Sequence, residues 1–265
     1  MIAIKNLAKS FGGLRAVHDC SLEIGSGTIT GLIGPNGAGK TTLFNMIAGA
    51  LRPTSGQILL DGRDIAGRQP HELFHMGIVR TFQIPHEFAE MTVIENLMLV
   101  PPQQSGESLF AAWLAWGRVR REEREIRVRA ESVLDFLQLR HLRDERAGKL
   151  SGGQKKLLEL GRTMMTDARL VLLDEPGAGV NPTLMGELAG LVQRLNRERG
   201  YTFCIIEHDM DLIAQLCDPV YVLAEGTVLT HGRMADIRRD PRVLEAYLGG
   251  SVEPATAPAR AGGAA

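Results

Sequence analysis

The stretch GPNGAGKTT, from Gly34 to Thr42, fits the phosphate-binding pattern G-x-x-x-x-G-K-[ST] at every position. Its glycines allow backbone N–H groups to turn inward around a polyphosphate, and Lys40 adds a positive charge for the β- and γ-phosphates. A β-rich run at 28–33 precedes the loop, and a helical pattern at 43–50 follows it, so that a positive helix N-terminus faces the bound anion. The sequence therefore predicts a nucleoside triphosphate site formed by Gly34, Pro35, Asn36, Gly37, Ala38, Gly39, Lys40, Thr41 and Thr42.

The composition of the 265-residue chain excludes several classes of protein. Hydrophobic residues make up 44% and charged residues 23%, as in an ordinary globular domain, and a net charge of −1 gives no basic field for nucleic acid. The longest apolar run, at 109–116, is far shorter than the roughly 18 residues that span a bilayer, and the N-terminus has no signal-peptide pattern. We therefore expect a cytoplasmic protein with buried free thiols at Cys20, Cys204 and Cys217.

The order of sequence patterns predicts an α/β fold. Strand patterns fill residues 2–33, helical character dominates from about 84 to 168, and buried strands return at 170–173 and 202–206 with a helix near 184–199 between them. This alternation predicts a parallel sheet. Further expectations are a hairpin at Asp61-Gly62, a charged helix at 118–139, one domain over 1–250 with a helical subdomain at about 84–168, and a disordered tail at 251–265.

A second motif places two carboxylates at the end of a buried strand. LVLLDEP, at 170–176, is an apolar run that ends in Asp174 and Glu175. Ligands of parallel α/β sheets bind at the carboxyl ends of the strands. We expect Asp174 to hold Mg²⁺ beside the phosphate loop, together with the hydroxyl of Thr41, and Glu175 to orient and deprotonate the attacking water.

A third motif is LSGGQ at 150–154. Ser151 and Gln154 have the spacing of a capping box that opens a helix. Glycines at 152 and 153 are poor helix formers, so their presence in the first turn favours exposed backbone N–H groups that contact a second phosphate.

With these motifs the chain resembles the nucleotide-binding subunits of ATP-binding cassette (ABC) transporters over about residues 2 to 249. The resemblance implies a P-loop NTPase of ABC ATPase type, with a parallel sheet core, an N-terminal antiparallel β subdomain and an inserted α-helical subdomain. It also implies that Phe11 stacks on adenine, that Gln83 joins the catalytic site and the Mg²⁺ ligands, and that His208 contacts the γ-phosphate. In that family the signature residues Ser151, Gly152, Gly153 and Gln154 contact the ATP of a partner subunit.

Several segments are similar to one branch of that family, the importers of branched-chain and other hydrophobic amino acids and their relatives for urea and short amides. They are GIVRTFQ at 77–83, RREERE at 120–125, EMTVIENL at 90–97 and EAYLGG at 245–250. Asn181 stands where many family members have an aspartate, and the Asn form is familiar in the same branch. That loop lies along the dimer seam in the family, so the departure concerns communication between the two sites.

The resemblance implies an ATPase, with ATP and Mg²⁺ as ligands, that powers import of hydrophobic amino acids. The alternatives are a urea or short-amide importer of the same branch, a lipid or lipopolysaccharide exporter, an ABC ATPase outside transport, and a non-catalytic nucleotide-gated scaffold. The implied partners are permease subunits, a second ABC ATPase subunit (an identical chain or a paralogue) and, indirectly, a periplasmic binding protein. The implied location is the cytoplasmic face of the inner membrane.

One surface is a candidate for docking of the permease. Ile84, Phe88, Met91 and Val93 bring apolar groups to the boundary of the helical subdomain, where a helix of the membrane subunit could lie in a groove. The same residues would also serve simply to pack the subdomain, and the sequence leaves both interpretations open.

Overall fold

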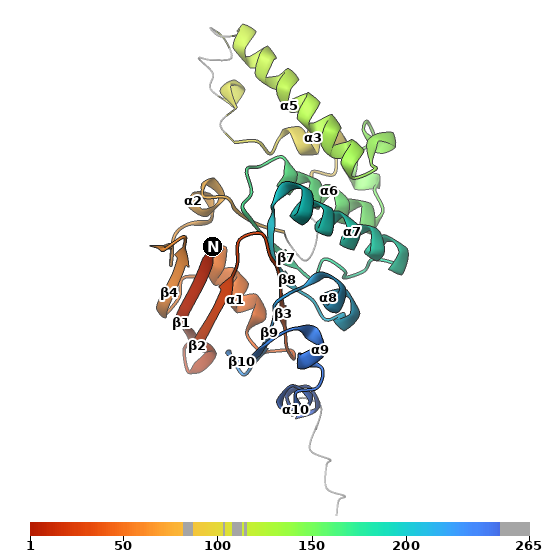
Figure 1. Ribbon diagram of the computed structural model, residues 1–265. Coiled ribbons are helices and arrows are strands. Elements are labelled where there is room, and N and C mark those ends of the chain that lie inside the picture. Colours follow the sequence, from red (N-terminus) through yellow and green to blue (C-terminus); the bar gives the residue numbers. More distant parts are fainter. Residues whose placement is uncertain (82–86, 103, 108–112, 114–115, 250–265) are drawn as a thin grey trace, which may run out of the picture.

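The computed structural model describes residues 1–81, 87–102, 104–107, 113 and 116–249. A four-stranded antiparallel sheet lies beside a six-stranded sheet, and a helical part extends away from both (Figure 1). The antiparallel sheet has the order β2-β1-β4-β5. Its strands are β1 (Ile2–Phe11), β2 (Leu14–Ile24), β4 (Ser55–Leu60) and β5 (Arg63–Asp64).

The six-stranded sheet has the order β10-β9-β3-β8-β7-β6, and it is parallel except for β10, which runs antiparallel to β9. Because β3, β8 and β7 are neighbours and run in one direction, the loops that follow them emerge at the same edge. The strands are β3 (Ile29–Ile33), β6 (Ile78–Arg80), β7 (Leu170–Asp174), β8 (Thr202–Ile206), β9 (Val220–Ala224) and β10 (Thr227–Gly232).

Alternate residues of the central strands enter two separate hydrophobic clusters. In β7, Leu170 and Leu172 join the cluster that contains α1 and the antiparallel sheet, whereas Val171 and Leu173 join the cluster that contains α6 and α7. This period of two is the geometry of a strand buried on both faces. The strands are therefore fixed in register, and the functional loops at their ends are held by a rigid base.

The helices cover the two faces of the sheet and form the extension. Helices α3 and α5 pack on each other and on α6, away from the strands (Figure 1). The helices are α1 (Lys40–Ile47), α2 (Pro70–His75), α3 (Val93–Met98), α5 (Trp116–Phe136), α6 (Gly152–Met164), α7 (Pro182–Arg199), α8 (Met210–Leu216), α9 (Met234–Ile237) and α10 (Pro241–Gly249). Short 3₁₀ helices are η1 (Ser105–Glu107), η2 (Arg140–Leu142) and η3 (Ala147–Lys149).

The structure confirms the predicted α/β fold, with its parallel core, antiparallel N-terminal sheet and helical insertion. The hairpin at Asp61-Gly62 joins β4 to β5, and both turn residues have positive φ. The helix expected at 118–139 begins two residues earlier and ends at Phe136. All three cysteines are buried free thiols, as predicted. The tail at 251–265 lies outside the described residues.

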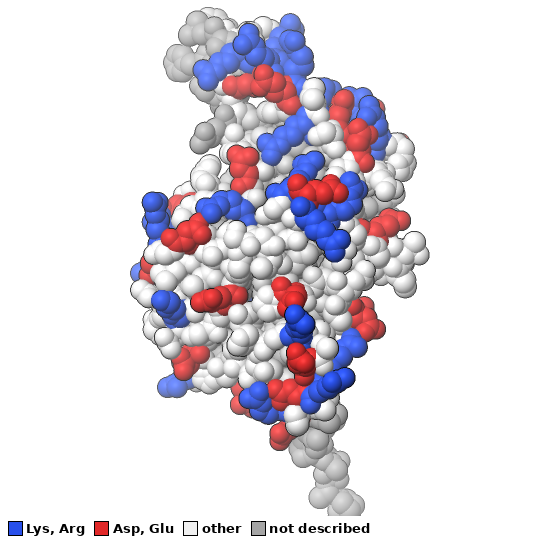
Figure 2. All heavy atoms as spheres, in the orientation of Figure 1, with Lys and Arg blue, Asp and Glu red and all other residues white. Residues whose placement is uncertain are grey.

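Charged side chains of both signs are interspersed on the face shown in Figure 2, with arginines of α5 prominent at its upper end. The near-zero net charge is therefore distributed, and this face has no field of a single sign. In the part of the chain that the structure describes, no helix combines the length and the apolar character needed to cross a bilayer.

Candidate active site

The phosphate loop, Glu175 and His208 meet at the carboxyl edge of the six-stranded sheet. Register explains this meeting, because β8 pairs Ile206 with Leu32 of β3 on one side and with Asp174 of β7 on the other. The residues that follow these strands line one cleft of about 200 Å³. The lining residues are Ala16, Asn36, Gly37, Ala38, Gly39, Lys40, Thr41, Thr42, Glu175 and His208.

The phosphate loop is packed tightly against the strand beside it. Gly34 has φ of 148°, and a Cβ at this position would lie 2.0 Å from the carbonyl oxygen of Leu223 in β9. Only glycine fits this close approach of two backbones. The loop ends at Gly39, which is the N-cap of α1, and the N-terminus of α1 then faces the cleft with Lys40 and Thr41. Backbone N–H groups at such a helix start favour an anion.

Lys40 is buried beneath the loop, where its ammonium group donates to the carbonyl oxygens of Gly34 at 2.7 Å and Pro35 at 2.9 Å. An ammonium group carries three N–H donors, so one remains for a phosphate oxygen beside these two bonds. Burial lowers the pKa of Lys40, and the negative charges of Glu175 and Asp174 partly oppose that effect. The neighbouring carboxylates thus help to keep Lys40 charged for phosphate binding.

Glu175 and His208 contact each other at the wall of the cleft. Glu175 Oε1 lies 2.9 Å from His208 Nε2, and both side chains are partly exposed. Glu175 has φ of 47°, an unusual value for a residue with a side chain, and its N–H donates to the carbonyl of Ile206. The carboxylate is thereby turned toward His208 and away from the line of β7.

Asp174 is buried and forms an ion pair with Arg80 of β6, with 2.8 Å between Arg80 Nη2 and Asp174 Oδ2. Arg80 also donates to the side chain of Asn45 in α1. The pair leaves the second oxygen of Asp174 available, and Thr41 presents its hydroxyl in the cleft. A Mg²⁺ ion at a triphosphate site needs only one or two protein oxygens beside phosphate oxygens and water, so Thr41 and Asp174 fit such an ion. Gln83, the third expected ligand, lies outside the described residues.

The signature residues open α6 with the predicted capping box. Ser151 Oγ accepts from the N–H of Gln154, and the Gln154 side chain accepts from the N–H of Ser151. Gly153 also lies against α7, because a Cβ there would be 1.7 Å from Cδ2 of Leu184 and that side chain would have to shift. Ser151 and Gly152 are exposed, and no signature residue lines the cleft that contains Lys40.

Two further predicted residues lie away from the cleft lining. Phe11, at the end of β1, is 47% exposed and has Lys9 Nζ 5.1 Å from its ring centre. Its accessible ring is compatible with stacking on adenine, which stays a prediction. Asn181 is the N-cap of α7 and accepts from the N–H of Leu184 at 2.9 Å. An aspartate would serve the same capping role, which explains why the fold tolerates the exchange.

Comparison with known proteins places this geometry in a family. A family model described as "ABC transporter" matches residues 17–178, which include the phosphate loop, the signature and both strand-end carboxylates. The chain belongs to the ABC transporter family. A second model, described as "Branched-chain amino acid ATP-binding cassette transporter", matches residues 227–253 of this cassette.

Similar curated proteins match this ABC cassette over almost their whole lengths. One is the probable branched-chain amino acid transport ATP-binding protein LivG of Archaeoglobus fulgidus, 44% identical, with 94% of this chain and 95% of the relative covered. The high-affinity branched-chain amino acid transport ATP-binding protein LivG of Escherichia coli K12 is 41% identical, with 94% and 98% covered.

Solved structures of ABC cassettes have the same fold. The ADP conformation of an ATP-binding cassette from an ABC transporter is 39% identical, with a TM-score of 0.80 and coverage of 94% of this chain and 98% of that one. A nucleotide-free cassette is 38% identical, with a TM-score of 0.79 and coverage of 93% and 98%. This chain is therefore an ABC ATPase, and its nucleotide hydrolysis is coupled to transport.

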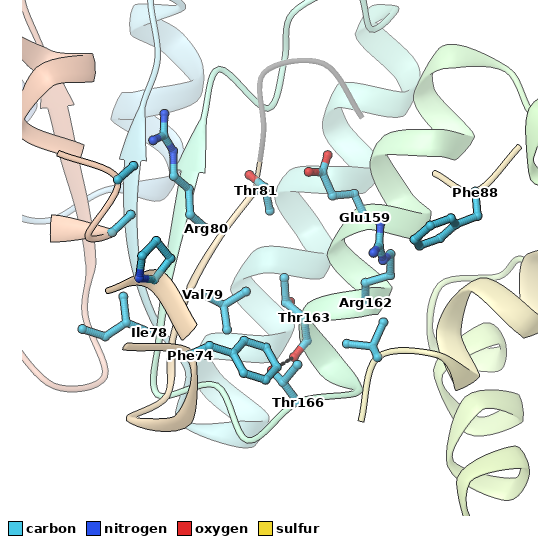
Figure 3. A pocket seen from close by; sticks show the side chains of 14 residues that line it. Phe74, Ile78, Val79, Arg80, Thr81, Phe88, Glu159, Arg162, Thr163 and Thr166 are labelled. Carbon is cyan, nitrogen blue, oxygen red and sulfur yellow. Dashed lines mark hydrogen bonds between the residues drawn. The ribbon is translucent and has the colours of Figure 1, made fainter. Parts of the chain in front are cut away.

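The cassette also has an apolar pocket of about 480 Å³ between β6 and α6 (Figure 3). Phe74 enters it from α2, Val79 from β6, and Thr163 from α6, while Arg162 lies with its guanidinium 5.6 Å from the ring centre of Phe88. Of the residues expected at a docking surface, Phe88 lines this pocket and is 47% exposed. Val93 is instead fully buried in the hydrophobic cluster of α6, so it packs the helical part. Ile84 lies outside the described residues.

Sequence patterns missed three charged residues that support the site. Arg80 holds Asp174, Lys156 of α6 donates to the carbonyl of Glu175, and Glu207 accepts from the N–H of Gly177. Each contact joins residues that are distant in the chain, so local spacing carries no signal for it. A useful signal was the position of Glu207 between an apolar strand and His208, because a carboxylate in such a buried place needs partners.

Proposed function

We propose that this cassette hydrolyses ATP to power an importer of branched-chain or other hydrophobic amino acids. The observation that carries the proposal is the similarity to branched-chain amino acid cassettes over 94% of the chain, together with the separate match of the branch-specific model at residues 227–253. The exposed nucleotide cleft supports the ATPase part of the proposal. The cargo itself rests on the relatives, which are named for branched-chain amino acid transport.

In the proposed mechanism Glu175 orients the attacking water and accepts its proton, and His208 contacts the γ-phosphate. The 2.9 Å contact between their side chains, at the wall of the phosphate cleft, supports this assignment. Lys40 offsets the negative charge that develops on the phosphoryl oxygens. Bound Mg²⁺, held by Thr41 and Asp174, and by Gln83 as the family resemblance implies, would supply further charge neutralisation on the β- and γ-phosphates.

A second subunit would complete each ATP site. Ser151 and Gly152 are exposed at the N-terminus of α6, and the signature residues do not line the cleft of their own chain. A head-to-tail dimer, with two identical chains or two paralogues, would place this helix start on the partner's γ-phosphate. Hydrolysis removes that phosphate bridge and weakens the interface, which links chemistry to subunit separation.

The apolar pocket of Figure 3 is the proposed contact with the permease. It lies between the sheet and the helical part, and it presents Phe74, Val79 and Phe88 beside the polar groups of Glu159 and Arg162. A short amphipathic helix from a membrane subunit fits such a surface. This contact would hold the cassette at the cytoplasmic face of the inner membrane, with a periplasmic binding protein as an indirect partner.

Steady-state ATPase assays test the catalytic assignment. We expect Glu175→Gln to lower kcat roughly a hundredfold or more, because the amide does not accept the water proton, while the KM for ATP changes little. The matched control is Glu187→Gln, which alters an exposed carboxylate on α7 and should leave turnover unchanged. Equal phosphate release by wild type and Glu175→Gln would refute the assignment.

Uptake assays test the cargo. Cells that lack the gene should lose uptake of radiolabelled leucine and keep uptake of urea. In a separate experiment, the purified subunit should co-purify with a membrane permease. Loss of urea uptake with normal leucine uptake would favour the amide importer of the same branch. Unchanged uptake of both compounds would refute the importer.

A further inference from the structure

Glu207 is a buried carboxylate that the proposed mechanism does not use. It follows β8 directly and is only 5% exposed. Its Oε1 accepts from the N–H of Gly177 at 2.6 Å, and its Oε2 accepts from the N–H of His208 at 3.0 Å. One carboxylate therefore ties the segment after Glu175 to the backbone that carries His208.

A buried carboxylate is costly unless hydrogen bonds and positive charge compensate it. Three backbone N–H groups supply the bonds, those of Gly177, His208 and, at 3.5 Å, Asp209, and both carboxylate oxygens accept. Lys156 of α6 is also buried, and Glu207 is among the carboxylates that attract its ammonium group. The positive charge of this buried lysine offsets part of the cost of burying the carboxylate, so Glu207 is suited to hold two loops at once.

Lys156 holds the segment at residues 175–177 from its other side. Its Nζ donates to the carbonyl oxygen of Glu175 at 3.2 Å, and the N–H of Ala178 donates to that carbonyl as well. The backbone of residues 175–177 is thus fixed from α6 at its start and from Glu207 at its end. Between these points Glu175 has its unusual φ of 47° and contacts His208.

We propose that Glu207 is a positioning residue for ATP hydrolysis: its hydrogen bonds to the backbone N–H groups of Gly177 and His208 hold the two segments together and so set the Glu175–His208 contact. The proposal rests on the proposed function, because it takes Glu175 and His208 as the catalytic pair. Glu207 itself does not line the nucleotide cleft, so it acts through these two residues. Lys156 provides a second anchor for residues 175–177 through the signature helix.

The test is Glu207→Gln, which keeps the size of the side chain but replaces one acceptor oxygen by an NH₂ group that faces a backbone N–H. We expect kcat to fall at least roughly tenfold, because a small displacement of a catalytic group is enough for such a loss. The KM for ATP and the affinity for a fluorescent ATP analogue should stay within about twofold, because the phosphate loop is untouched. Asp211→Asn, which changes an exposed carboxylate four residues further on, is the control and should match wild type.

Thermal unfolding separates a positioning role from a general loss of structure, because a melting temperature close to that of wild type shows that Glu207→Gln is folded. Normal turnover in Glu207→Gln would overturn the proposal, and so would a fall in kcat matched by an equal loss of nucleotide binding. If Glu207→Gln does not fold, Lys156→Met replaces it as the test, with the same expected split between kcat and KM. If the Glu207 variant does not fold, a folded Lys156→Met protein with normal kcat would also overturn the proposal.

A double variant distinguishes failure of this proposal from failure of the catalytic assignment. If Glu207 acts through Glu175, adding Glu207→Gln to Glu175→Gln should lower kcat by less than about twofold more, whereas independent effects would multiply. A full tenfold further loss would overturn the positioning role and leave the role of Glu175 intact. Normal turnover in Glu175→Gln alone would instead refute the proposed function, whatever Glu207→Gln does.

Discussion

At the scale of single residues, the Arg80–Asp174 pair is a buried electrostatic contact that supports the nucleotide site. Both side chains are largely shielded, with exposed fractions of 15% and 6%, and the paired atoms are 2.8 Å apart. The guanidinium also bonds Asn45 in α1, the helix that begins at Lys40. Arg80 therefore joins the strand-end carboxylate to the phosphate-loop helix.

We expect Arg80→Met to lower the free energy of unfolding by about 3–5 kcal/mol, because it leaves Asp174 buried without its cation. Denaturant unfolding measures the loss. The control is Arg169→Met, which breaks an exposed pair with Asp61 at 2.6 Å and should cost under about 1 kcal/mol. Equal losses of unfolding free energy in the two variants would show that the buried Asp174 pair stabilises the protein no more than an exposed pair does.

The residue scale also shows where sequence reasoning ends. Lys40 and Glu175 could be named from the sequence because each belongs to a motif that follows an apolar strand, whereas His208 was named because the resemblance to ABC cassettes implied it. Arg80 could not, because its partner Asp174 is 94 residues away and only the β6–β7 pairing brings them together. Glu207 was visible only as the neighbour of His208, and its bond to Gly177 depends on how two loops cross.

At the scale of elements, the sequence predicted the existence of strands and helices better than their contacts. The strand at 202–206 has the predicted bounds, and the Ser151–Gln154 capping box opens α6 as expected. The reason for Gly153, however, lies in another helix. Glycine was expected there for bare N–H groups, but the structure adds that α6 and α7 cross closely at Leu184. Such a crossing has no signature in local sequence.

We expect Gly153→Ala to destabilise the protein by about 1–3 kcal/mol, because the added methyl group overlaps Leu184 and overpacks the α6–α7 contact. Adding Leu184→Ala should recover part of that loss, which denaturant unfolding of the four variants of the cycle would measure. The control is Gly186→Ala in α7. A Cβ has open space there, so this variant should be more stable than wild type by roughly 0.5–1 kcal/mol. A Gly153→Ala protein as stable as wild type would contradict the close crossing.

At the scale of the whole molecule, two clusters of apolar side chains on either face of the six-stranded sheet hold the site. The composition predicted enough apolar residues for such a core. It did not predict two separate clusters, because a continuous run of apolar residues such as β7 does not show which face of the sheet each residue takes. The cysteines report on this core. Cys20 and Cys204 belong to one cluster and Cys217 to the other.

Burial raises the pKa of Cys20 to about 12 and that of Cys217 to about 12, and it raises the pKa of Cys204 as well. In the unfolded chain these thiols titrate near their ordinary value of 9.0, so above that pH the unfolded state loses protons that the folded state keeps. The stability from each thiol is therefore complete below pH 9 and is lost as the pH rises toward 12. Lys40 and Lys156, whose pKa values are lowered, act in the opposite sense at high pH.

A difference measurement isolates the thiol effect from that of the lysines. Between pH 9 and 10, unfolding of wild type and Cys20→Ala in urea should show a shallower loss of stability in the variant, by up to about 1.4 kcal/mol per pH unit. At pH 8 a thiol reagent should leave all three cysteines of the native protein largely unmodified and modify all three in guanidinium. Parallel pH slopes for the two proteins, or rapid modification of Cys20 in the native state, would mean that the antiparallel sheet opens to solvent far more readily than its packing indicates.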